Sequence, residues 1–133
     1  MAHGNDNHTS EQAAEVISQL WLDAMLPARE AFVQRLFGVF IREEPKRVAS
    51  IRDAVTHKDL DRIRYLAHSL KGAAATMGCE QVRRTCLEME AAAEDHNLHE
   101  VKNSLDRLEQ KMDCVYAKMN DLLKMMNRDD AGA

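Results

Sequence analysis

His68 is the residue whose surroundings in this sequence best suit chemistry, and it lies on a segment that should form a helix. The segment spans residues 59–77, because Asp59 fits an N-cap and Gly78 fits a C-terminal stop. At about 100° per residue, the apolar side chains gather on one side of this helix: Ile63, Leu66, Ala67, Leu70, Ala73, Ala74 and Met77. His68 falls almost opposite. Four residues surround it on the helical wheel: Arg64, Lys71, Gly72 and Ala75. We therefore expect the imidazole to be exposed.

Gly72 is the most informative neighbour of the histidine. Glycine inside a helix costs about 1 kcal/mol relative to alanine, so stability gives no reason for it here. A helix surface without a side chain at Gly72, and with only a methyl group at Ala75, leaves room for another protein's active site beside the ring. Lys71 places an ammonium group where it can contact an anion on the imidazole. The arrangement suits a phosphate acceptor.

The segment resembles the signature of histidine phosphotransfer (HPt) domains of bacterial two-component phosphorelays. That signature is a histidine, two residues, Lys-Gly, then small residues, an apolar residue and glycine. Here it reads His68-Ser69-Leu70-Lys71-Gly72, followed by Ala73-Ala74-Ala75-Thr76-Met77-Gly78. The match extends upstream through 58–60 and Leu66-Ala67, and downstream through Val82, Cys86 and Met89-Glu90, so that it covers the chain from about Phe32 onward.

The resemblance implies a four-helix bundle in which His68 is the phosphorylated residue, while Lys71 and Gly72 assist docking and transfer. It also implies that the phosphoryl group moves from a receiver-domain aspartate to His68 and then to another receiver aspartate. The receiver domains of hybrid sensor kinases and response regulators are the partners that it implies. The receiver would supply the Mg²⁺, so we expect no cofactor of the chain's own, no metal site and no enzymatic activity. We add Arg64 and Ala75 as phosphoryl-stabilising or docking residues, and Gly78 as a structural residue of the motif.

The remaining elements are also helical, which predicts an all-α fold. The clearest period, with spacings of three and four, lies in the predicted helix 98–126: Leu98, Val101, Leu105, Leu108, Met112, Val115, Met119, Leu122 and Met126. Asn97 followed by Glu100 fits its N-cap. Other helices are predicted over 28–56, kinked or restarted at Pro45, over 79–95, and over 10–25 behind a capping box at 9–12, with Trp21 as a packing residue. Residues 9–128 then form one HPt domain, an antiparallel four-helix bundle with an additional N-terminal helix, between disordered tails at 1–8 and 129–133.

Composition narrows the class of protein further. A chain of 133 residues suits one domain, and its formal net charge of -4, with basic residues interspersed among acids, argues against nucleic acid as a partner. The longest apolar runs fall far short of the roughly 20 residues that cross a bilayer, so we expect no membrane span. Three cysteines without zinc-type spacing and a start without a secretion signal predict a cytoplasmic protein. We expect a monomer, and the initial Met and polar ends favour a free-standing protein.

Two other functions remain open at this point. The phosphoacceptor domain of a sensor kinase is also helical, but such sites typically follow the histidine with an acid and soon with a proline, whereas Ser69 follows here and no proline comes after Pro45. The chain also has no glycine-rich nucleotide-binding segment. The other alternative is a helical adaptor that oligomerises through the apolar stripe of 98–126 without phosphotransfer.

Overall fold

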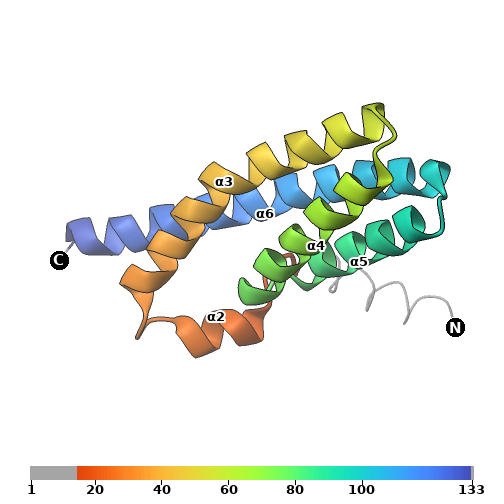
Figure 1. Cartoon of the computed structure of the whole chain (residues 1–133). Helices are drawn as coiled ribbons and strands as arrows, with labels where there is room; N and C mark the ends of the chain where they lie inside the picture. Colours follow the sequence, from red (N-terminus) through yellow and green to blue (C-terminus); the bar gives the residue numbers. More distant parts are fainter. Residues whose placement is uncertain (1–14, 133) are drawn as a thin grey trace, which may run out of the picture.

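The computed structural model describes residues 15–132, and all the regular structure in this range is helical. The helices, in chain order, are α2 (Gln19–Met25), α3 (Glu30–Thr56), α4 (Leu60–Thr76), α5 (Glu80–Glu94) and α6 (Leu98–Gly132). Helices α3 to α6 form an antiparallel bundle, and the short α2 crosses the end of it near the C-terminus of α4 (Figure 1). The predicted fold class, an all-α bundle with an additional N-terminal helix, is confirmed.

Apolar side chains from all four long helices fill one core. Phe37 and Ile51 of α3, Leu70 of α4 and Met89 of α5 are among its fully buried members. The apolar stripe of α6 points into the same core, with six of its side chains at most 3% exposed: Val101, Leu105, Leu108, Met112, Val115 and Met119. Because the bundle buries this stripe, the stripe leaves no free surface of the kind that the adaptor alternative requires.

The three connections within the bundle share one turn geometry. Each places a residue with positive φ after a helix: Lys58 (54°), Gly78 (69°) and His96 (57°). The residue after each of these donates its backbone N–H to a carbonyl five residues earlier, as Asp59 does to Ala54 at 2.9 Å. This is the Schellman motif, and its last residue here is also the N-cap of the next helix. These tight turns hold neighbouring helices antiparallel, which fixes α5 beside the histidine helix.

The N-terminal helix is shorter than predicted. Residues 15–18 are not helical, so the prediction of a helix over 10–25 is wrong for these residues. The predicted capping box at 9–12 and the predicted tail at 1–8 lie outside the described residues. Val16 and Ile17 are buried without being helical. Ser18 caps α2 instead: its hydroxyl accepts the Trp21 N–H at 3.3 Å, and its own N–H donates to the Gly78 carbonyl at 2.8 Å.

α3 was predicted over 28–56, and it begins two residues later, at Glu30, and ends at Thr56 as predicted. α3 runs through Pro45 as one helix without the restart that the prediction allowed, because the burial of Phe40 and Val48 on either side offsets the one hydrogen bond that proline cannot donate. α6 continues to Gly132, so the predicted tail at 129–133 is wrong as far as that residue. The sequence has no glycine or proline between Leu98 and Gly132 that would end the helix earlier. Between residues 15 and 132, no helix is long and apolar enough to cross a membrane.

Candidate functional site

His68 lies on the face of α4 that points away from the core. Ile63, Ala67, Leu70 and Ala74 on the opposite side of the helix are fully buried, which fixes the rotation of α4 in the bundle. The His68 side chain keeps 70% of its surface exposed. The ring is therefore accessible to a macromolecular partner.

Glu90 of α5 fixes the protonation of the histidine ring. Its Oε2 lies 3.3 Å from His68 Nδ1, and because a carboxylate only accepts hydrogen bonds, Nδ1 carries the proton and donates it. In the neutral ring, this leaves a lone pair on Nε2. The Glu90 side chain is only 16% exposed, so the packing of α4 against α5 holds the carboxylate in place. Nε2 is therefore the ring nitrogen that makes no hydrogen bond to Glu90.

Lys71 binds the other oxygen of the same carboxylate. Its Nζ lies 2.7 Å from Glu90 Oε1 as an ion pair, although Oε1 accepts no well-directed hydrogen bond from the described residues. Because Glu90 contacts both groups, the Lys71 ammonium group lies near the imidazole. The Lys71 side chain is 22% exposed, which places it at the edge of the site. The structure thus brings together His68 and Lys71, which the sequence predicted, and Glu90, for which the sequence reasoning assigned no role.

The other predicted residues of the site are open to solvent. A Cβ built on Gly72 would meet nothing within 4 Å, so bare backbone lies one turn beyond the histidine. Ala75 is exposed, two turns beyond it. Arg64 is exposed one turn before the ring and makes no ion pair within residues 15–132. These three residues share the face of α4 with His68, and within residues 15–132 no hydrogen bond or ion pair joins them to the ring.

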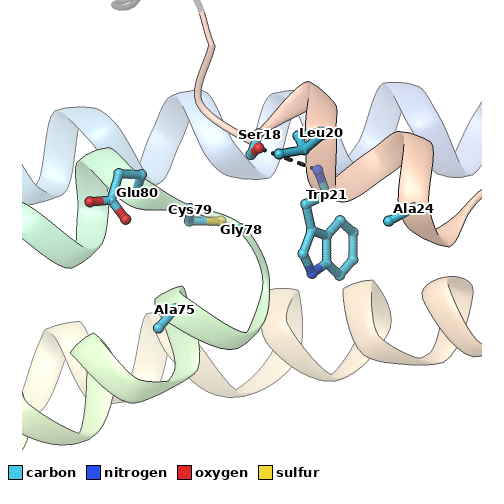
Figure 2. Close-up of a pocket in the computed structure, with 8 residues that line it drawn as sticks. All are labelled: Ser18, Leu20, Trp21, Ala24, Ala75, Gly78, Cys79 and Glu80. Carbon is cyan, nitrogen blue, oxygen red and sulfur yellow. Dashed lines mark hydrogen bonds between the residues drawn. The ribbon is translucent and has the colours of Figure 1, made fainter.

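Gly78 and α2 close the C-terminal end of this helix. A Cβ at Gly78 would lie 2.7 Å from Cβ of Trp21, so the glycine serves close packing as well as its φ of 69°. The indole of Trp21 reaches from α2 toward the Gly78 turn (Figure 2). Its Nε1–H donates to the Thr76 carbonyl at 3.0 Å, and its ring stacks on Phe37 with centroids 6.2 Å apart. Trp21 is a packing residue, as the sequence indicated, and it also binds an unpaired carbonyl at the end of α4.

The cysteines near the site are poor nucleophiles. Burial, with a smaller contribution from the charge of Glu90, raises the pKa of Cys86 to about 12. Burial alone raises the pKa of Cys79 to about 12. Both therefore remain protonated thiols at neutral pH, whereas the His68 side chain is 70% exposed. In the described range, no three His, Cys, Asp or Glu side chains gather in a way that suits a metal ion.

Glu90 belongs to the segment that resembles the family, but its residue type and position did not indicate a role at the site. Glu90 follows Met89 of the apolar stripe and comes before the α5–α6 turn. An acidic residue at such a position is usually a solvated surface charge. The signal that could identify it is its position, one turn after the buried Cys86 and next to the apolar stripe of α5. Two arginines early in α5, Arg83 and Arg84, form ion pairs with Glu80 on their own helix, at 2.6 and 3.5 Å.

Comparisons with known proteins agree with this geometry. The family model for the Hpt domain matches residues 35–118. Histidine-containing phosphotransfer protein B (HptB) of Pseudomonas aeruginosa PAO1 superposes with a TM-score of 0.78 at 21% identity, covering 83% of this chain and 96% of its own. The histidine-containing phosphotransfer protein ZmHP2 of maize superposes with a TM-score of 0.76 at 15% identity, covering 94% of each chain. No curated protein matches the sequence significantly.

The all-α bundle presents the exposed ring of His68 one turn from the bare backbone of Gly72. The chain belongs to the Hpt domain family, because the family model spans well over half of it. Its function is histidine phosphotransfer in a phosphorelay, and receiver domains are the class of partner that this family implies.

Proposed function

We propose that His68 is the phosphoacceptor and that the phosphoryl group is carried on its Nε2. The observation that carries this proposal is the hydrogen bond from Nδ1 to Glu90, which leaves the lone pair on Nε2 of an exposed ring. In the described part of the chain, His57, His96 and His99 are exposed too, but none has a helical glycine one turn away with open space above it.

In the forward step, Nε2 attacks the phosphorus atom of an aspartyl phosphate on a receiver domain. The N–P bond forms as the P–O bond to the aspartate breaks, and the carboxylate leaves with the electron pair. The ring gains positive charge while Nδ1 keeps its proton, and Glu90 stabilises this charge through the hydrogen bond it already makes. The reverse step delivers the phosphoryl group to the aspartate of a second receiver domain.

Lys71 and Gly72 would serve the same step from the next turn of α4. A phosphoryl group adds about 1.5 to 2 negative charges, and an ammonium group held beside the ring can neutralise its oxygens. Lys71 would then exchange part of its ion pair with Glu90 for a contact with the phosphoryl group. Arg64, one turn before the ring, would add a second cation. The open backbone at Gly72 would let the receiver approach in line, and its Mg²⁺ would neutralise the equatorial oxygens.

The proposal also covers the setting of this exchange. The receiver domains would belong to a hybrid sensor kinase and to a response regulator. The carrier would act as a monomer, because the apolar stripes of α3 to α6 are buried in its own core. A cytoplasmic location suits its three free cysteines, since thiols persist in a reducing compartment.

The experiment is transfer from a receiver domain that carries a labelled phosphoryl group. The wild-type protein should take up label in an acid-labile, base-stable form, and His68→Gln should take up none. Label retained by His68→Gln at the wild-type level would place the acceptor elsewhere. Loss of the charged hydrogen bond in Glu90→Ala should slow transfer about 10- to 100-fold, the equivalent of roughly 1.5 to 3 kcal/mol. Wild-type rates in that variant would contradict the role of Glu90.

A further inference from the structure

Thr76 is the last residue of the histidine helix, and its hydroxyl group binds the backbone of the preceding turn. Its Oγ1–H donates to the carbonyl oxygen of Gly72, four residues earlier, at 3.1 Å. In an α-helix this carbonyl also accepts the Thr76 backbone N–H, so the hydroxyl occupies its second lone pair. Both residues are exposed, and Gly72 has no side chain to cover its backbone. The bare backbone one turn from His68 therefore has its carbonyl acceptor filled from within the chain.

A contact from another helix holds Thr76 in place. Trp21 of α2 donates its indole N–H to the Thr76 carbonyl at 3.0 Å, and its ring stacks on the buried ring of Phe37. The carbonyls of residues 73–75 accept backbone N–H groups from the turn that follows α4. The last turn of the helix is therefore closed against fraying, which keeps the Thr76 hydroxyl within reach of the Gly72 carbonyl.

Two other threonines make the same local bond in a different setting. Thr56 donates to the Arg52 carbonyl at 3.1 Å, and Thr85 donates to the carbonyl four residues before it at 2.9 Å. Threonine commonly makes this bond within helices. The two residues that carry those carbonyls have long side chains, whereas Gly72 has none. The bond of Thr76 is therefore distinguished by the bare surface on which it lies.

A receiver domain that reaches His68 covers this stretch of α4. A stable interface buries about 800 Å² on each partner, which corresponds to a disc of roughly 16 Å radius. At about 1.5 Å per residue, Gly72 lies roughly 6 Å from His68 along the helix axis and Thr76 roughly 12 Å. Docking therefore removes water from the Gly72 carbonyl. A carbonyl that loses water without a replacement hydrogen bond weakens binding, and the Thr76 hydroxyl supplies that bond before the receiver arrives.

We propose that Thr76 is a positioning residue for the docked receiver domain, because its hydroxyl keeps the Gly72 carbonyl hydrogen-bonded when the receiver excludes water from the bare backbone. The inference rests on the proposed function, from which it takes the approach of the receiver over Gly72. Thr76 lies too far along α4 to contact the ring of His68, so it contributes to receiver binding and not to the chemical step.

The test compares the transfer kinetics of Thr76→Val and Thr56→Val. Each variant replaces a hydroxyl with a methyl group at the last residue of a helix, and valine and threonine have similar helix propensities. Thr76→Val should raise the KM for a phosphorylated receiver domain about 5- to 30-fold and leave kcat within twofold, because the carbonyl keeps its helical bond and loses only the second one. Thr56→Val should leave both constants unchanged. Equal KM values for the two variants would overturn the inference.

Two further measurements separate this role from a structural one. The unfolding temperatures of Thr76→Val and Thr56→Val should agree within about 2 °C, because each variant loses one exposed hydrogen bond at a helix end. A much lower unfolding temperature of Thr76→Val would overturn the inference, since the hydroxyl would then serve the fold. Thr76→Ser keeps the hydroxyl and should have the KM of the wild-type protein. A KM like that of Thr76→Val would assign the effect to the methyl group instead.

A binding titration tests the link to Gly72 without turnover. The probe is the receiver domain with beryllofluoride in place of its phosphoryl group. Thr76→Val should weaken binding about 5- to 30-fold in the wild-type background but less than about threefold in Gly72→Ala, because the added methyl group keeps the receiver away from the carbonyl and leaves room for water. Equal weakening in the two backgrounds would contradict the inference.

These outcomes separate the inference from the proposed function. If His68 takes up the label and Thr76→Val transfers with the KM of the wild-type protein, only the role of Thr76 fails. If the wild-type protein takes up no label from any receiver domain of its source organism, the proposed function fails first.

Discussion

Replacing Gly72 with leucine should affect stability and function in opposite directions. In the structure, a Cβ at this position meets nothing within 4 Å, so a side chain can point into solvent without strain. Leucine is a better helix former than glycine by about 0.8 to 1 kcal/mol, and Gly72→Leu should therefore unfold about 3 to 5 °C higher than the wild-type protein.

The same side chain would occupy the space through which a receiver domain approaches His68. Displacing the reacting groups by about 1 Å is enough to cost roughly 100-fold in rate, the equivalent of about 2.7 kcal/mol in activation free energy. We expect a loss of at least this size in kcat/KM for phosphotransfer from Gly72→Leu. Gly72→Ala should gain similar stability and lose less activity, because a methyl group fills less of that space.

Gly38 provides a matched control on α3. It is also an exposed helical glycine whose added Cβ would meet nothing within 4 Å. Gly38→Leu should gain the same stability and transfer at the wild-type rate. The assay is thermal unfolding together with single-turnover transfer from a phosphorylated receiver domain. Equal transfer by Gly72→Leu and Gly38→Leu would refute the clearance argument, and a lower unfolding temperature of Gly72→Leu would refute the open geometry.

Two further predictions concern the fold. Gly78→Ala should lower stability by more than about 1 kcal/mol, because a side chain at φ 69° is strained and its Cβ would displace Trp21. Lys58→Gly should be neutral or stabilising, because Lys58 already has a positive φ of 54°. Thermal unfolding followed by Trp21 fluorescence distinguishes the two results. The buried thiols of Cys79 and Cys86 have a pKa of about 12 in the folded protein, against an ordinary value of 9.0. As the pH rises above 9, the unfolded state therefore loses these protons before the folded state does. The free energy of unfolding should fall as the pH rises from about 9 toward 12. At pH 10 the loss is about 1 kcal/mol per thiol, to be measured by denaturant unfolding. A thiol reagent at pH 8 should modify only the exposed Cys114 quickly, and rapid reaction of all three cysteines would contradict this.

The sequence predicts most of the bundle because each of its long helices has apolar residues at helical spacing along one side. Apolar spacings of three and four in α6, and the apolar side of α4, match residues that the structure buries or packs partly buried against the core. The wheel places His68 outside for the same reason. Gly72 stands out because an exposed helical glycine contradicts helix propensity and because it lies one turn from an exposed histidine, a combination that Gly38 lacks.

The remaining features depend on contacts between segments far apart in the chain. Ser18 begins α2 because its backbone donates to Gly78, and nothing local distinguishes it from the earlier candidates at Thr9 and Ser10. The role of Glu90 depends on how deeply α4 packs against α5, which periodicity does not give.

The most direct measurement is NMR spectroscopy of the ¹⁵N-histidine-labelled protein after phosphorylation by a receiver domain. We predict coupling between phosphorus and Nε2 of His68, with the proton retained on Nδ1 beside Glu90. Coupling to Nδ1 of His68, or to a nitrogen of any other residue, would contradict the account.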